Sequence, residues 1–432
     1  MAAERELAWE RRLEALEAAE AGLEARPRYL PATFASLRHR NYRHLWLGQV
    51  GASASLWMEQ VIRPVLILQL TDSALQVGLV VATRMAPLLL LGLLAGVVAD
   101  RFDKRRILIS TQMVTMSMHF LLASLVLAGV VEPWHVFVTA FVSGSSMAFN
   151  QPARQSLLPR LVPERDLLNA VFLNTAAMNV MRIAGGGLAG LLLIPLGVGA
   201  VYLLNGILYI GVLWTTYAIA LAKDEERPHD GGSWLADLKE GLAHVARNRI
   251  VLYVVGPALI LFVFGLPYQS VFVPPLAVKV LGLGESGVGA LLAVTGAGAL
   301  AGSLTMASQR SLPRRGVMLM AFLALFSAAL MALSRTDWLA LSAALLAAAG
   351  SMSVSYIALT NTLLLENTPR ELHGRIMSLM SLDRGLVPLG AIIGGALASS
   401  LGPQDGLLVM ASTCLLLTAA LAALAGSLRS LR

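Results

Sequence analysis

The chain has 432 residues, of which 56% are hydrophobic and only 14% are charged, and its mean hydropathy is +0.70. A soluble domain is about a quarter charged, so this composition excludes an ordinary soluble protein and predicts an all-α integral membrane protein. The net charge of +7 is not carried by a basic patch interleaved with aromatic residues, which argues against a nucleic-acid partner. The single cysteine, Cys414, excludes an internal disulfide and is expected to pack inside the protein.

The first 43 residues are polar and contain no apolar stretch of the signal-peptide type. Glu4 to Arg28 has leucines at helical spacing and predicts a polar helix, which either is a solvated tail or lies on the inner leaflet. We therefore treat 1–43 as a cytoplasmic N-terminal segment.

Apolar runs long enough to cross the hydrocarbon core follow one another through the rest of the chain. Residues 223–249 interrupt them, and the apolar stripe from Trp234 to Val245 predicts an amphipathic helix in this cytoplasmic linker. We predict twelve transmembrane helices, at about 44–70, 74–99, 106–130, 134–156, 167–194, 198–222, 250–276, 286–308, 315–334, 337–362, 375–400 and 404–427.

Most of the Lys and Arg residues lie in every second link between these runs, while the other links hold only Lys279 and Arg335. Cytoplasmic loops carry an excess of basic residues. We therefore expect a multi-pass protein of the bacterial cytoplasmic (inner) membrane with both termini in the cytoplasm.

The two halves of the chain resemble each other. Ala95-Gly96 has a counterpart in Ala301-Gly302, about 206 residues further on, and Pro163 has one in Pro369 at the same offset. Six crossings in each half give parallel repeats, so we expect two six-helix bundles, 44–222 and 250–432. A pseudo-twofold axis along the membrane normal would relate them, and a substrate site would lie between them near the midplane.

Few charged residues lie inside the predicted spans, where they are costly and normally face a cavity or a partner. Glu59 and Arg63 lie four residues apart and can pair on one helix face. Glu59 is the first candidate for proton coupling and Asp383 the second, with Arg63 and Arg384 as their partners; the alternative for each is a static ion pair. His119 is expected to be a packed, hydrogen-bonded side chain.

Other polar and aromatic residues of the spans are candidates for a substrate cavity that suits a bulky amphiphile. Arg84 and Arg182 would attract an anionic substrate or neutralise Glu59 and Asp383. For each of the others, helix packing is the competing interpretation, and they are Gln49, Trp57, Gln60, Asn174, Asn179, Phe264, Tyr268, Gln269, Tyr356 and Asn361.

Three loops carry sequence motifs, which begin at Gly96-Val-Val-Ala-Asp100-Arg101, at Asn150-Gln-Pro152 and at Leu372-His373-Gly374. They resemble the loop signatures of the major facilitator superfamily, and within it the bacterial branch of enterobactin and macrolide exporters. The resemblance implies a cytoplasmic gate in which Gly96 allows a helix to approach closely and Asp100 acts as a latch. The other implied gate residues are Arg101, Lys104, Arg105, Arg106, Arg154 and Arg375.

The fifth run departs from the exporter pattern, because Gly185, Gly186, Gly187 and Gly190 replace its usual Gly-Pro pair. Small residues still let helices approach.

The resemblance implies secondary active, proton-coupled efflux of a small amphiphilic molecule, such as a drug or siderophore, by alternating access. The expected partners are that substrate, protons and membrane lipids, and the protein is expected to be monomeric. Two alternatives remain open: a lysophospholipid-type carrier of the same fold, and a membrane sensor that transports nothing. No metal-ligand spacing and no nucleophile-base pair indicates an enzyme or a cofactor.

Overall fold

A computed structural model describes residues 32–220, 249–308, 314–366 and 386–424, and every regular element in these ranges is helical. The predicted N-terminal helix, the linker 223–248 and the candidates Arg375, Asp383 and Arg384 lie outside these ranges.

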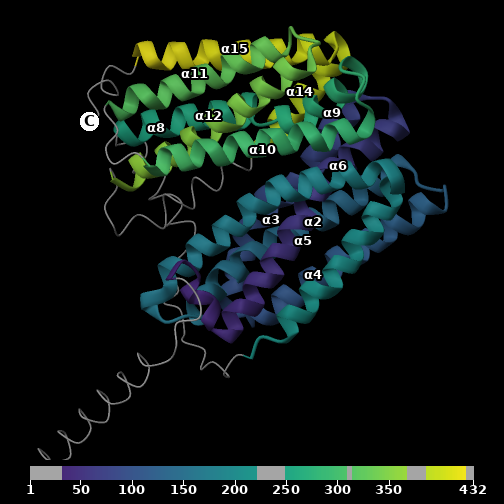
Figure 1. Cartoon of the computed structure of the whole chain (residues 1–432), viewed down its shortest axis with the longest axis vertical. Coiled ribbons are helices and arrows are strands. Elements are labelled where there is room, and N and C mark those ends of the chain that lie inside the picture. Colours follow the sequence, from purple (N-terminus) through teal and green to yellow (C-terminus); the bar gives the residue numbers. More distant parts are fainter. Residues whose placement is uncertain (1–31, 221–248, 309–313, 367–385, 425–432) are drawn as a thin grey trace, which may run out of the picture.

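The N-terminal half, shown in purple to teal in Figure 1, starts with a short 3₁₀ helix and continues with long helices. These elements are η1 (Ala32–Arg38), α2 (Arg40–Thr71), α3 (Ala74–Arg101), α4 (Lys104–Leu127), α5 (Pro133–Leu157), η2 (Leu158–Arg160) and α6 (Glu164–Tyr217).

The C-terminal half, in green and yellow, starts with α8 (Arg249–Ile260), which continues into wider π-helical turns. Three prolines, Pro267, Pro274 and Pro275, lie in this stretch and cannot donate the regular helical hydrogen bond. The elements that follow α8 are η3 (Leu261–Gly265), η4 (Tyr268–Phe272), α9 (Val273–Pro275), η5 (Leu276–Val280), α10 (Gly284–Ser308), α11 (Arg315–Leu333), α12 (Leu339–Glu366), α14 (Val387–Leu401) and α15 (Pro403–Leu424).

Helix α6 is broken at Gly197, whose φ of 72° and ψ of 171° are accessible almost only to glycine. An unbroken helix of 54 residues would be about 80 Å long at 1.5 Å per residue, far more than the roughly 30 Å of a bilayer core. The break thus separates two helices, close to where the sequence predicts a boundary between two spans.

Most of the described helices begin and end within a few residues of the predicted spans. The exceptions are α14, which begins at Val387 and not near 375, and the span predicted at 250–276, which is α8 followed by π-helical turns that end at Val280. Eight of them are long and apolar enough to cross a membrane, and α14 is a shorter apolar helix. The predicted count of twelve crossings and the pseudo-twofold axis stay predictions.

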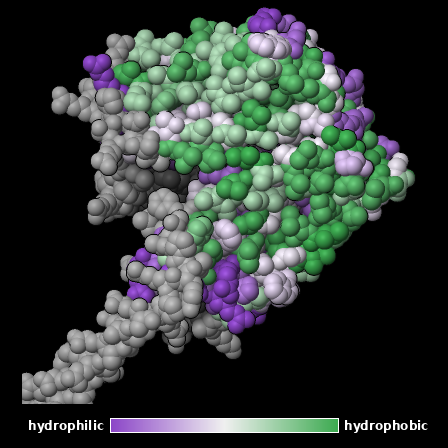
Figure 2. All heavy atoms as spheres, in the orientation of Figure 1, coloured by the Kyte–Doolittle hydropathy of each residue, from purple (hydrophilic) through white to green (hydrophobic). Residues whose placement is uncertain are grey.

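Figure 2 shows apolar side chains over the flanks of the helices, where a soluble protein would be polar. Trp134 at the start of α5 and Trp338 just before α12 are 60% and 69% exposed, and Trp214 near the end of α6 is 66% exposed. Exposed tryptophans near helix ends are typical of membrane-water interfaces.

The two halves pack against each other through two helix pairs, α6 with α10 and α3 with α14. Both contacts depend on small residues. A Cβ at Gly289 of α10 would lie 2.4 Å from Cα of Gly190 on α6, and a Cβ at Gly78 of α3 would lie 2.2 Å from the carbonyl oxygen of Ala391 on α14. Such close approach requires glycine.

Polar contacts join the halves at the end of the molecule that carries the turn between α2 and α3. Lys279 Nζ lies 2.6 Å from Asp72 Oδ1, and Gln69 donates a hydrogen bond to Glu285. Figure 1 shows the ribbons of the two halves meeting toward the end where α9 lies and separating toward the other end.

Candidate functional site

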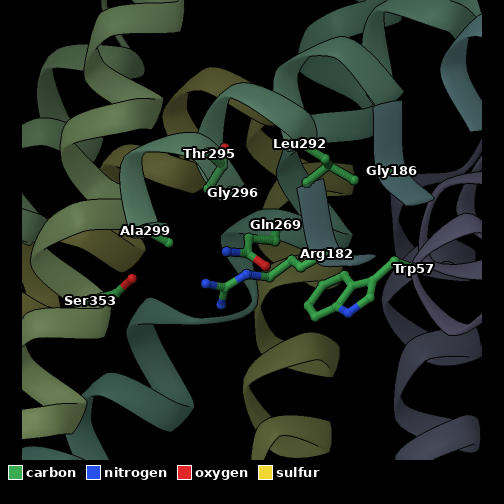
Figure 3. A pocket seen from close by; sticks show the side chains of 9 residues that line it. All are labelled: Trp57, Arg182, Gly186, Gln269, Leu292, Thr295, Gly296, Ala299 and Ser353. Carbon is green, nitrogen blue, oxygen red and sulfur yellow. The ribbon is translucent and has the colours of Figure 1, made fainter. Parts of the chain in front are cut away.

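A cavity lies between the two halves and has walls from both. Figure 3 shows Arg182 of α6 pointing into it, with Trp57 of α2 on one side and Gln269 of η4 beside the guanidinium group. The Arg182 guanidinium lies over the Trp57 ring, with 5.8 Å from Cζ to the ring centroid. The wall from α10 and α12 consists of Leu292, Thr295, Gly296, Ala299 and Ser353, and Gly186 of α6 completes the lining.

This arrangement gives the cavity a broad aromatic surface, one cation and several small side chains. Its empty volume is about 350 Å³, including space open to solvent. A concave site with apolar walls and few polar groups is typical of small-molecule binding. Because its walls belong to both halves, a relative movement of the halves would change its shape.

A charged cluster surrounds Glu59 inside the N-terminal half. The predicted pair forms: Arg63 donates hydrogen bonds through Nε and Nη2 to Glu59 Oε1. Arg84 Nη2 lies 2.7 Å from Glu59 Oε2, so a second cation from α3 joins the pair. All three side chains are at least 92% buried, and one carboxylate therefore faces two guanidinium groups in the bundle interior.

The rest of the cluster fixes the orientation of these side chains. Arg63 Nη1 donates to the carbonyl oxygen of Val136 at 3.0 Å and to Thr139 Oγ1 at 3.2 Å. His119 Nε2 lies 3.8 Å from Glu59 Oε2. The imidazole also packs beside the rings of Tyr202 and Tyr209, with centroid distances of 6.1 and 5.4 Å.

Glycine positions the second arginine. A Cβ at Gly144 of α5 would lie 1.9 Å from the carbonyl oxygen of Arg84, so the backbones of α3 and α5 approach closely at this level. From this backbone position, Arg84 reaches Glu59 on α2, 25 residues away in sequence.

The structure separates the predicted substrate residues into groups. Trp57, Arg182 and Gln269 line the cavity between the halves, whereas Gln49 and Arg84 line a second cavity inside the N-terminal half. The other predicted residues line neither cavity.

Among those others, Tyr268 is 1% exposed and packs edge-on against Phe326, with 5.6 Å between ring centroids. Tyr356 is equally buried, and Phe264 packs against the hydrophobic core. None of these three aromatic residues lines either cavity, and their contact with substrate stays a prediction. Gln60, Asn174, Asn179 and Asn361 are partly buried outside both cavities.

The predicted gate residues also have different surroundings. Arg105 reaches the end of α6, where Nη2 donates to the carbonyl oxygen of Tyr217 at 2.6 Å. Arg106 is exposed and lies 3.8 Å from Asp103, which caps α4. Lys104 is the first residue of α4, and the side chains of Asp100 and Arg101 are outside the described set.

Two gate residues lie in unlike surroundings, and the gate itself stays a prediction. Among the described residues, a Cβ at Gly96 would meet no atom within 4 Å, so no close helix contact is seen at this glycine. Arg154 is 6% exposed and lines the cavity inside the N-terminal half. By contrast, Gly185 and Gly190 provide the predicted close packing, against α2 and α10 respectively.

Sequence reasoning missed the α10 wall of the cavity between the halves. Leu292, Thr295, Gly296 and Ala299 recur at helical spacing, so one face of this helix is marked in the sequence. The pattern does not reveal that this face turns toward the other half. Within the described ranges, no cluster of three or more His, Cys, Asp or Glu side chains could hold a metal ion.

Comparison with known proteins decides the family, because residues 31–431 match the transmembrane secretion effector family. This chain belongs to that family of the major facilitator superfamily. It is 24% identical to the staphyloferrin A transporter of Staphylococcus aureus over 81% of this chain and 84% of the relative. It is 27% identical to the multidrug efflux pump Tap of Mycolicibacterium fortuitum over 82% of this chain and 88% of the relative.

The fold is also that of a solved transporter. A bacterial homologue of the human lysosomal transporter Spinster, in an inward-facing and unoccupied conformation, superposes with a TM-score of 0.71 at 15% identity. The match covers 90% of this chain and 98% of that one. The secretion effector described here is therefore a multi-pass bacterial membrane transporter.

Proposed function

We propose that this secretion effector is a proton-coupled exporter of small amphiphilic molecules from the cytoplasm, working by alternating access. The cavity shared by the two halves is the observation that carries this proposal. Its aromatic, aliphatic and small side chains suit an amphiphile, and its position allows one binding site to face each side of the membrane in turn.

The contacts between the halves support the conformational part of the proposal. The halves touch where the turn between α2 and α3 lies, and the alternation of basic links assigns this end to the outside of the cell. The described conformation is then closed to the outside, as expected for the state that loads substrate from the cytoplasm. Breaking the contacts around Asp72 and Gly289 would allow the opposite state.

Twelve crossings agree with the same scheme. The break at Gly197 divides α6 into two helices, and α2, α3, α4 and α5 then bring the N-terminal half to six. Six crossings in each half would put both chain ends on the same side of the membrane, predicted from the basic links to be the cytoplasm, and the cavity between parallel repeats.

Glu59 is the proposed coupling acid. Its carboxylate is buried and lies between Arg63 and Arg84, which come from two different helices. If α2 and α3 shift relative to each other, the contact to Arg84 changes while the contact to Arg63 within α2 is kept. Proton affinity at Glu59 would then depend on the conformation, and this dependence is what coupling requires.

Transport by the purified protein in liposomes with an imposed pH gradient tests the proposal. The probes are ethidium and dansyl-undecanoic acid, an amphiphilic cation and an amphiphilic anion. We expect gradient-driven flux of at least one probe, and loss of the gradient dependence in Glu59→Gln.

Two control variants make that result interpretable. Glu59→Asp keeps a carboxylate and should retain gradient-driven flux at a reduced rate. Asp405→Asn removes an exposed carboxylate that pairs with Arg335 at 3.1 Å and should behave as wild type. Gradient-driven flux that survives Glu59→Gln at matched protein levels would exclude Glu59 as the coupling acid. Binding of a probe without any flux would favour a sensor over a carrier.

A further inference from the structure

A second cavity lies wholly inside the N-terminal half and shares no lining residue with the cavity between the halves. It has an empty volume of about 650 Å³, including space open to solvent. All five long helices of this half contribute to its wall. The lining residues are Gln49, Ala52, Ser53, Leu56, Glu59, Arg84, Gln112, Thr115, Ser143, Ser146, Met147, Asn150, Gln151, Arg154, Met178 and Tyr209.

The charged groups of this cavity leave a net positive charge. Arg84 and Arg154 are two cations in the wall, and Glu59 is the one carboxylate. Glu59 is already paired with Arg63, which lies behind the wall, as well as with Arg84. Arg154 has no carboxylate partner among the described residues, although it is 94% buried.

Several buried polar groups in this wall have unused hydrogen-bonding capacity. Among the described residues, Arg154 makes one long hydrogen bond, 3.4 Å from Nη1 to the carbonyl oxygen of Leu45, and its buried Nη2 has no partner. Arg84 Nε, both polar atoms of the Gln112 amide and Ser143 Oγ are also buried without a partner within the described part of the chain. Such groups are normally satisfied by protein, water or ligand, and most of these can donate.

The cavity has charged groups at two separate levels and apolar side chains elsewhere in its wall. Arg84 contacts Glu59, whereas Arg154 contacts the backbone of Leu45, fourteen positions earlier on α2. At 1.5 Å per residue the two levels are about 20 Å apart along that helix. Leu56, Met147 and Met178 contribute apolar surface to the same wall, and methionine adapts to irregular ligands.

We propose that this cavity is a second binding site, in which Arg154 binds the carboxylate of an anionic amphiphile whose apolar part lies along Leu56, Met147 and Met178. A guanidinium group binds a carboxylate through two parallel hydrogen bonds, and Nη2 of Arg154 is free to donate. The amides of Gln151 and Asn150 lie in the same wall and add polar groups near Arg154 in sequence. This assignment rests on the proposed function in one respect, because it takes the bound anion to be the molecule that the protein transports.

The proposed site gives separate roles to the two arginines in the cavity wall. Arg84 compensates Glu59, so its charge is largely used within the protein. Arg154 lies far from that pair along the cavity and is the cation left for a ligand. An anion there would be separated from Glu59, so substrate and proton need not occupy the same groups.

Binding of a matched pair of probes tests the assignment. Dansyl-undecanoic acid and its methyl ester differ only in the negative charge, and their fluorescence is measured with the full chain in nanodiscs of phosphatidylcholine. The wild type is expected to bind the acid at least about tenfold more tightly than the ester, because a hydrogen bond to a charged group adds roughly that much.

Variants locate the preference in this cavity. Arg154→Gln should remove the preference for the acid while leaving ester binding unchanged, and Arg154→Lys should retain part of it. Glu59→Gln should strengthen acid binding, because Arg84 then has no carboxylate partner. Arg335→Gln removes an exposed cation at the other end of the protein and should keep the wild-type preference. A purely structural role of Arg154 would not change acid and ester binding differently.

Three results would overturn the site. The first is equal affinity for acid and ester in the wild type, and the second is an acid preference that persists in Arg154→Gln. The third is no binding of the acid up to about 1 mM, which corresponds to a binding free energy near −4 kcal/mol. Loss of acid binding when phosphatidylglycerol is added to the discs would assign the site to a lipid headgroup and also overturn it. Gradient-driven flux without any acid preference would refute the second binding site and leave the proposed transport function intact. An acid preference that depends on Arg154 but comes without flux would support the binding site and contradict the transport function.

Discussion

The close contact between α6 and α10 gives a direct way to shift the protein between its conformations. Gly289 faces Gly190, and a Cβ built on Gly289 would lie 2.4 Å from Gly190 Cα and 2.7 Å from the carbonyl oxygen of Gly186. These obstacles are backbone atoms and cannot rotate away. The substitution Gly289→Ala must therefore separate the two helices.

The size of the effect follows from the geometry. Carbon atoms in contact lie about 3.5–4.0 Å apart, so the helices have to separate by about 1 Å. Inserting one extra carbon into a well-packed interface typically costs about 1–3 kcal/mol. Since 1.4 kcal/mol is a factor of ten, the population of the state closed at this end should fall by roughly 5- to 150-fold relative to its alternative.

Cross-linking across the same end measures that population. Gln69 and Glu285 hydrogen-bond across the two halves, so cysteines at these two positions should be joined by a short bifunctional maleimide only in the closed state. Cys414 is fully buried and is replaced by alanine in this background. We expect slower cross-linking in Gly289→Ala.

The matched control is Gly186→Ala on the partner helix. A Cβ there would lie 3.8 Å from Cβ of Leu292, which is ordinary contact. Because Gly186 also lines the cavity between the halves, only cross-linking is compared. Equal cross-linking rates for Gly289→Ala and Gly186→Ala would refute the reasoning, since the two variants differ in whether the backbones must move.

Two further changes test the fold and the weaker contacts. Gly197→Ala places a side chain at a φ of 72°, which costs about 1–3 kcal/mol, so the melting temperature in detergent should fall. The control is Gly211→Ala, where a Cβ meets none of the described residues within 4 Å, and it should leave the melting temperature nearly unchanged. Lys279→Gln breaks an exposed ion pair worth about 0–1 kcal/mol, so the cross-linking rate between the halves should fall at most about fivefold, and the difference should shrink in high salt. A larger effect that salt does not change would contradict this estimate.

The order of the helices and one of the site contacts follow from short-range sequence patterns. Apolar runs of spanning length predict most of the described helices to within a few residues, although not the start of α14. The pairing of Glu59 with Arg63 was predictable because residues four apart share a helix face. Both depend on geometry within a single helix, which does not require knowledge of the neighbours.

Contacts between helices depend on how each helix is rotated and where it crosses its neighbours, and the sequence pattern contains little of this. Arg84 on α3 meets Glu59 on α2, and close packing of α3 against α5 at Gly144 fixes the position of the Arg84 backbone. Arg154 lies in a loop motif, yet its side chain is buried in the wall of a cavity.

Glycine illustrates the same division. The sequence shows many glycines in the spans, and Gly96 lies in a recognisable motif. Yet a Cβ at Gly96 would meet none of the described residues within 4 Å, while Gly289 and Gly78 lie where the two halves pack closely. The sequence by itself determined that this chain forms apolar helices with a few buried charges, because periodicity and composition are local properties. Only the tertiary structure decided which of those charges meet and which faces enclose a cavity, because these depend on the relative positions of residues far apart in the chain.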